Sequence, residues 1–166
     1  MRRFHQDDAH IFCTPDQVAG EIASCLGFVK HVYQERFGFQ PKYRLSTRPS
    51  KSAGSDELWA KAEAALKSSL DANVESWSLN AGDGAFYGPK IDLSIDDAMG
   101  RAHQVGTIQL DFQMPDRFDL KFQDTAGALH RPVMIHRAIL GRFEYIFFIA
   151  SYYVQNKLEL KTDFVA

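Results

Sequence analysis

The feature that most constrains the fold is a change in the spacing of apolar residues about halfway along the chain. Ile91, Leu93 and Ile95 alternate with polar residues, a pattern typical of a strand with one buried face. Residues 42–47, 104–112, 118–123 and 133–136 have the pattern of further strands, and residues 76–79 look extended. Short turns join the later strands, and strands joined in this way pair antiparallel. We therefore predict an antiparallel sheet.

Other stretches have helical spacing. Thr14, Pro15 and Gln17 suit the N-cap, the first position and the capping box of a helix. The expected apolar face of this helix consists of Val18, Ile22, Leu26, Val29 and Tyr33. Residues 56–72 form a second expected helix, and the chain is expected to become helical again from residue 138. Helices packed on an antiparallel sheet give an α+β fold, and a length of 166 residues suits one domain.

Charge and cysteine content narrow the functional classes. The net charge is −2, so the chain lacks the overall basic character that announces nucleic-acid binding, although a local patch could still bind RNA. Two cysteines in a chain without a secretory signal predict a reduced, intracellular setting and no disulfide. The longest apolar run, residues 145–154, is too short to cross a bilayer. We therefore expect no membrane partner.

The stretch HQDDAHIFC, residues 5–13, holds two acids, two histidines and a cysteine. It fits three interpretations: a metal site, a carboxylate catalyst or a polar hairpin. If residues 10–13 are a strand, His10 and Cys13 point to opposite faces, and Cys13 is then a small buried hydrophobic residue. Asp7 and Asp8 also face opposite ways on a strand, which makes them a poor acid/base pair by themselves.

Two later stretches suggest a ligand site. In GDGAFYGPK three glycines let the backbone approach a ligand closely, while Tyr87 offers a hydroxyl and Lys90 a positive charge. An ordinary hairpin loop explains the same residues. In QVGTIQLDF the side chains of Gln104, Thr107 and Gln109 either hydrogen-bond a small polar molecule or face solvent. The residues alone thus predict a polar ligand site on an α+β domain and leave the ligand open.

Five segments in order resemble threonyl-tRNA synthetase, a class II aminoacyl-tRNA synthetase; they are HQDDAHIFC, LSTRP, GDGAFYGPKID, GTIQLDF and RPVMIHRAILGRFE. The resemblance implies a class II catalytic core, in which an antiparallel sheet flanked by helices carries the active site on its face. It implies activation of threonine by ATP and Mg²⁺, transfer to tRNA-Thr, and a homodimer in the cytoplasm or mitochondria. It also implies a Zn²⁺ ion that binds the amino and hydroxyl groups of threonine and thereby rejects valine.

The resemblance also assigns roles to individual positions. The implied zinc ligands are His10 and His136. The implied catalytic residues around threonine are Gln6, Asp8, Tyr87 and Gln104. The implied substrate- and ATP-binding residues are Arg2, Lys90, Thr107 and Gln109. Cys13 matches a family position that is not a metal ligand.

Departures from the family limit what the isolated chain is expected to do. The resemblance places the third zinc ligand, a cysteine, and motif 1, which forms the dimer interface, upstream of this sequence. In motif 3, Tyr145 stands where the family has an arginine that holds ATP. We therefore predict an incomplete catalytic core over residues 1–144 and a divergent tail over residues 145–166. The predicted function is that of a part of a threonine–tRNA ligase, inactive by itself; the alternative is a catalytically dead fragment or a binding module.

Overall fold

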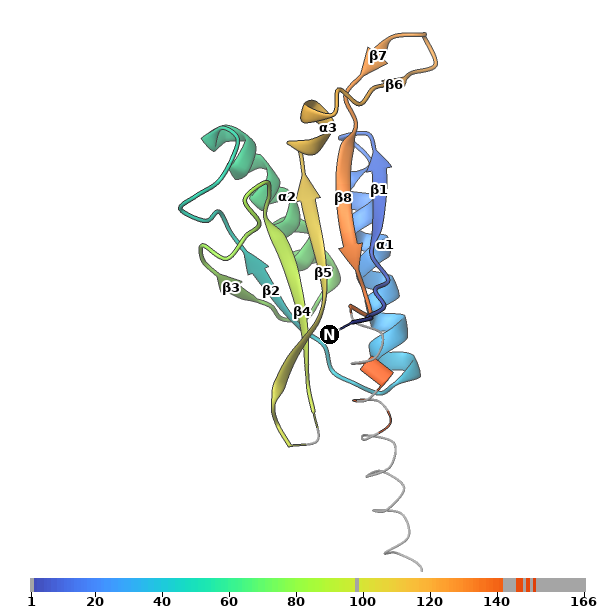
Figure 1. Ribbon diagram of the computed structural model, residues 1–166, viewed down its shortest axis with the longest axis vertical. Helices are drawn as coiled ribbons and strands as arrows, with labels where there is room; N and C mark the ends of the chain where they lie inside the picture. Colours follow the sequence, from blue (N-terminus) through green and yellow to red (C-terminus); the bar gives the residue numbers. More distant parts are fainter. Residues whose placement is uncertain (1, 98, 142–145, 148, 150, 152–166) are drawn as a thin grey trace, which may run out of the picture.

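The computed structural model describes residues 2–97, 99–141, 146, 147, 149 and 151, and Figure 1 shows the order of the elements. The strands are β1 (Ala9–Cys13), β2 (Lys42–Ser46), β3 (Ser78–Asn80), β4 (Lys90–Asp96), β5 (Ala102–Asp111), β6 (Phe122–Gln123), β7 (Leu129–His130) and β8 (Val133–Ala138). The helices are α1 (Val18–Val29), the π-helix η1 (Lys30–Arg36), α2 (Asp56–Asn73) and α3 (Met114–Arg117). None of the helices in this described part is both long and apolar enough to cross a membrane.

Six strands form the main sheet in the order β1-β8-β5-β4-β2-β3, while β6 and β7 form a separate two-stranded hairpin. The pairs from β1 across to β2 are antiparallel, as predicted. The pair of β2 and β3 is parallel, because α2 carries the chain back along the sheet between these two strands. The sheet is therefore mixed rather than wholly antiparallel, within the predicted α+β class.

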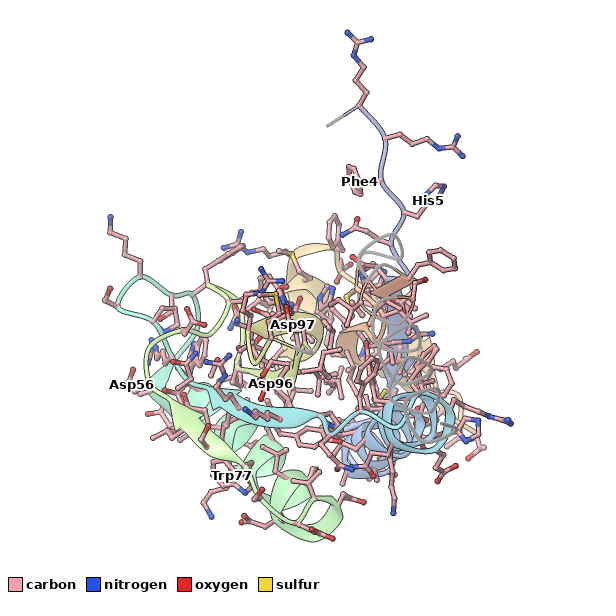
Figure 2. The ribbon with its side chains drawn as sticks, turned by 90° about the horizontal axis from the view of Figure 1, so that it is seen from below. Phe4, His5, Asp56, Trp77, Asp96 and Asp97 are labelled. Atoms are coloured by element: carbon pink, nitrogen blue, oxygen red, sulfur yellow. The ribbon has the colours of Figure 1, made fainter. Side chains whose placement is uncertain are left out.

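One face of the sheet is covered by α1, η1 and α2 (Figures 1 and 2). All five predicted apolar residues of the first helical segment are buried, and so is the apolar stripe of α2, which consists of Trp59, Ala62, Leu66 and Leu70. Ile91, Leu93 and Ile95 of β4 are fully buried in the same hydrophobic cluster. Because alternate residues of a strand point to opposite faces, Lys90, Asp92 and Ser94, which alternate with these isoleucines and Leu93, face away from the helices.

The first helix begins later than predicted. Residues 15–17 form a turn, and α1 begins at Val18. The Thr14 hydroxyl donates to Asp16 at 2.5 Å instead of capping the helix. Half of the predicted capping box is nevertheless present, because the Gln17 side chain accepts from the backbone N–H of Thr14 at 3.0 Å.

The predicted strand over residues 118–123 is mostly wrong, since only Phe122–Gln123 pair with β7. The short helix α3 precedes this segment, and its start is held by the Asp111 carboxylate, which accepts from the backbone N–H groups of Gln113 and Met114 at 2.7 and 3.0 Å. The backbone N–H groups of residues 118–120 donate back to carbonyl oxygens of α3 at 2.9–3.1 Å, so these residues form a turn rather than a strand. The helix expected from residue 138 also begins later: β8 continues through Ala138, and the described residues 146, 147, 149 and 151 are helical. The rest of the predicted tail, residues 145–166, lies outside the described residues.

Candidate functional site

Residues that lie directly opposite one another form a polar row across all six strands of the sheet. The row consists of His10, His136, Gln109, Lys90, Ser46 and Asn80, one residue from each strand. Their neighbours along the strands, such as Ile108 and Ile135, are fully buried in the core. The polar row therefore lies on the sheet face that α1, η1 and α2 leave uncovered.

A β-bulge brings one more polar side chain to this face. The register between β4 and β5 shifts between Leu93 and Ser94, and Val105 is the extra residue on β5. Strict alternation would place Gln104 and Thr107 on opposite faces of the sheet. The bulge puts both side chains on the same, uncovered face.

A cavity of about 600 Å³ opens on the uncovered face. Five of the ten predicted site residues line it, namely Gln6, Asp8, Gln104, Thr107 and Gln109. The other lining residues are Val105, Gly106, Ala138, Leu140 and Gly141. Among the described residues no lysine or arginine lines the cavity, and Asp8 is its one charged side chain. The lining therefore suits a ligand that presents a cationic group and neutral polar groups.

The two neighbouring carboxylates of the N-terminal stretch have different partners. Asp7 accepts from the consecutive backbone N–H groups of Ile139, Leu140 and Gly141 at 3.0–3.1 Å. Asp7 thus fastens the N-terminal segment to the chain that follows β8. Asp8 lines the cavity instead, so the two carboxylates do not work on one ligand as an acid/base pair.

Tyr87 of the glycine-rich loop is joined to β5 by side-chain hydrogen bonds. Its hydroxyl donates to Gln109 Oε1, and Gln109 Nε2 donates to the Thr107 hydroxyl at 3.1 Å. Burial, followed by the nearby Asp111 carboxylate, raises the pKa of Tyr87, so the hydroxyl stays protonated at neutral pH and remains a donor. The loop therefore fixes the orientation of two side chains that line the cavity.

The glycines of this loop approach the protein's own backbone. A Cβ atom on Gly84 would lie 2.6 Å from the carbonyl oxygen of Thr47, and one on Gly88 would lie 1.8 Å from that of Leu110. Residues with a Cβ atom do not fit at these two positions while the loop packs on β5 and the end of β2. The pattern that suggested close approach to a ligand therefore has a packing role in this structure.

His10 and His136 oppose each other across the β1–β8 pair, with ring centroids 4.7 Å apart. His136 Nε2 lies 2.8 Å from the fully buried carboxylate of Asp111, which orients the ring and leaves its other nitrogen for a ligand. Cys13 is buried on the opposite side of β1, as strand alternation predicted. No group of three or more His, Cys, Asp or Glu side chains within the described ranges could hold a metal ion. The two imidazoles alone do not form a complete zinc site.

Lys90 does not line the cavity but is connected to it through a buried carboxylate. Its ammonium donates to both oxygens of Asp92 at 2.9 Å and lies 3.4 Å from Asp83. Asp92 also accepts from Gln104 Nε2 at 2.9 Å. The charge of Lys90 is thus balanced by the protein's own carboxylates.

Arg2 lies in an exposed N-terminal segment and is not a lining residue. Figure 2 shows Phe4 and His5 of this segment projecting on the side of the molecule opposite α2.

Sequence reasoning missed Asp92 and Asp111 as parts of the site. The available signal was an acidic residue in each of two strands that are otherwise rich in buried apolar residues.

Comparison with known proteins gives consistent matches. The family model of the tRNA synthetase class II core domain (G, H, P, S and T) matches residues 1–150. The mitochondrial threonine–tRNA ligase of Homo sapiens is 59% identical over 144 residues, which are 87% of this chain and 20% of that protein. The cytoplasmic enzyme of Caenorhabditis elegans is 56% identical over 144 residues, with the same two shares.

Among solved structures, the RNA binding domain of threonyl-tRNA synthetase from Cryptosporidium parvum Iowa II superposes with a TM-score of 0.86 and 49% sequence identity. The match covers 93% of this chain and 39% of that chain. This chain spans about a fifth of the length of the curated relatives described above.

Proposed function

Because the chain belongs to the tRNA synthetase class II core domain family, we propose that it is part of the catalytic core of a threonine–tRNA ligase. The observation that carries the proposal is the cavity on the uncovered sheet face, where Gln6 and Asp8 meet three polar residues of β5. Two relatives that are more than half identical are threonine–tRNA ligases. This similarity favours threonine among the five amino acids of the family.

We assign threonine binding to the cavity. Asp8 is the one charged side chain among the described lining residues, so it is the group that meets the threonine ammonium, through a charge-assisted hydrogen bond. Gln104 and Thr107 supply neutral hydrogen-bonding groups for the remainder of the ligand. Such groups distinguish threonine from valine, because valine would leave a polar group of the site unpaired.

The resemblance implies zinc, which when bound would act as a Lewis acid toward the hydroxyl group and the deprotonated amino group of threonine; without a complete zinc site the amino group stays an ammonium. His10 and His136 would hold the ion, with Asp111 orienting His136. The described residues provide no third ligand. We therefore assign no step of the reaction to the metal in this chain.

The proposal includes ATP with Mg²⁺ and tRNA-Thr as further substrates, and a homodimer as the assembled enzyme. The location is either the cytoplasm or the mitochondria, since relatives of both kinds match. The isolated 166-residue chain is proposed to be inactive, because no described lysine or arginine lines the cavity to stabilise phosphate charge. The same observation supports the alternative, a binding module without catalysis.

Threonine is expected to bind the isolated chain saturably and more tightly than valine. Titration of isotope-labelled protein should shift the NMR signals of Gln104, Thr107 and Gln109. Asp8→Asn is expected to weaken binding about tenfold or more, because a hydrogen bond to a charged group contributes about 1.5–3 kcal/mol. Asp71→Asn, on the surface of α2, is the matched control. Equal affinity for valine, or unchanged affinity in Asp8→Asn, would contradict the assignment.

Zinc is expected to bind weakly and to be lost on dialysis against metal-free buffer. Zinc sites use at least three protein ligands, whereas the described residues offer the imidazoles of His10 and His136. The measurement is the zinc content of the protein after dialysis, for the wild-type chain and for His136→Ala. His31→Ala, on the exposed surface of η1, is the control variant. A stoichiometric zinc ion that survives dialysis and disappears in His136→Ala would show that another residue completes the site.

A further inference from the structure

Asp92 is a buried carboxylate on the uncovered face of the sheet, with 3% of its surface exposed. Three side chains donate hydrogen bonds to it. Lys90 donates to both oxygens at 2.9 Å, Gln104 Nε2 donates to Oδ1 at 2.9 Å, and the Ser46 hydroxyl donates to Oδ2 at 2.5 Å. The donors come from three adjacent strands, β2, β4 and β5.

Burial of a carboxylate is costly unless its lone pairs are satisfied by hydrogen bonds and its charge is balanced. Asp92 meets both conditions, since Lys90 balances its charge and both oxygens have two donors. The arrangement continues outward, because Asn80 Nδ2 donates to the Ser46 hydroxyl at 3.2 Å and to Asp83 at 3.0 Å. Asp92 is therefore the centre of a network that joins four strands to the glycine-rich loop.

This network determines what Gln104 presents to the cavity. A glutamine amide can offer either its donor or its acceptor end to a ligand. The Gln104 nitrogen is bonded to Asp92, which does not itself line the cavity. The carbonyl oxygen of Gln104 is therefore the end left to accept a hydrogen bond from a ligand.

We propose that Asp92 is a positioning residue, which fixes the Gln104 amide with its carbonyl oxygen toward the ligand and holds Lys90 beside it. Without the carboxylate, the Gln104 amide is free to rotate and Lys90 loses its counterion. The site then loses selectivity for a ligand that donates hydrogen bonds at this point. The proposal rests on the proposed function insofar as the ligand is threonine.

The test measures two quantities: the rate at which the side-chain amide protons of Gln104 exchange with water, followed by NMR, and the affinity for threonine. The Gln104 signals are assigned by their loss in Gln104→Met. In the wild-type chain the Gln104 amide protons should exchange with water more slowly than those of the exposed Gln40. Asp92→Asn should remove this protection and weaken threonine binding about tenfold. Asp92→Glu, which keeps the carboxylate, should retain protection. Asp111→Asn removes a carboxylate from the same face that does not contact Gln104, and it should leave the protection unchanged.

The proposal would be overturned if an Asp92→Asn variant that melts cooperatively kept the exchange protection of the Gln104 amide protons and the affinity for threonine. If that variant does not fold, the wild-type chain decides alone: a Gln104 amide that exchanges as fast as that of Gln40 would also overturn it. If the wild-type chain binds no threonine, the proposed function fails, while the exchange measurement still tests the positioning role of Asp92. The two failures are therefore distinguishable.

Discussion

Gly88→Ala is expected to lower the free energy of unfolding by about 3 kcal/mol or more, at the upper end of the cost of overpacking. The added Cβ atom would lie 1.8 Å from the backbone oxygen and 3.0 Å from the backbone carbon of Leu110. Leu110 is fully buried in the central strand β5, and its N–H donates to the carbonyl oxygen of Pro89 at 3.1 Å. Neither Gly88 nor Leu110 can move away from the other without separating the glycine-rich loop from the sheet.

Gly27→Ala is the matched control, because its Cβ atom would meet nothing within 4 Å. Gly27 lies within α1, where alanine is favoured over glycine by about 0.5–1 kcal/mol. Urea unfolding followed by circular dichroism should therefore show opposite shifts for the two variants. A Gly88→Ala protein as stable as the wild type would show that the loop does not pack on β5 in this way.

The purified 166-residue chain is expected to show no threonine-dependent exchange of pyrophosphate into ATP. Attack of the threonine carboxylate on the α-phosphate develops negative charge, which fixed cations must stabilise. Within the described residues no lysine or arginine lines the cavity, and Lys90 is already paired with Asp92. Each missing group of this kind costs on the order of 100–1000-fold in rate.

Tyr145→Arg is expected not to restore the exchange. Tyr145 lies outside the described residues, at the position where the resemblance implies an arginine. One guanidinium supplies one of the several cations that similar enzymes use, so the barrier remains high. A full-length relative assayed in parallel is the positive control. Exchange by the unmodified chain would contradict the account, and exchange that appears only in Tyr145→Arg would show that one guanidinium suffices.

The parts of the fold that could be predicted depend on local periodicity. The spacing of apolar residues predicts which face is buried, both in the alternation at Ile91, Leu93 and Ile95 and on the apolar faces of α1 and α2. The burial of Cys13 on the face opposite His10 followed from the same alternation. The parallel β2–β3 pair could not be predicted in this way, because the pairing depends on where α2 returns the chain.

The parts of the site that were missed depend on contacts between distant segments. Gln104 was named as a site residue, but the bulge at Val105 that puts it on the same face as Thr107 could not be predicted, because it arises only when β4 and β5 pair. Asp92 and Asp111 were not named from the sequence, because most of their hydrogen-bond partners come from distant segments: Ser46 and Gln104 for Asp92, and the start of α3 and His136 for Asp111. The resemblance named five of the residues that line the cavity, but the network that orients Gln104 came from the structure.

The central claim is that this chain forms part of a threonine–tRNA ligase catalytic core and carries its threonine-binding face. The most direct test places the matching 144 residues of this chain in the full-length mitochondrial threonine–tRNA ligase of Homo sapiens, in exchange for the segment to which they are 59% identical. The account predicts that this chimera charges tRNA-Thr with threonine, and that charging is strongly reduced when Asp8→Asn is added. A chimera that melts cooperatively like the parent enzyme but fails to charge tRNA-Thr would contradict the claim.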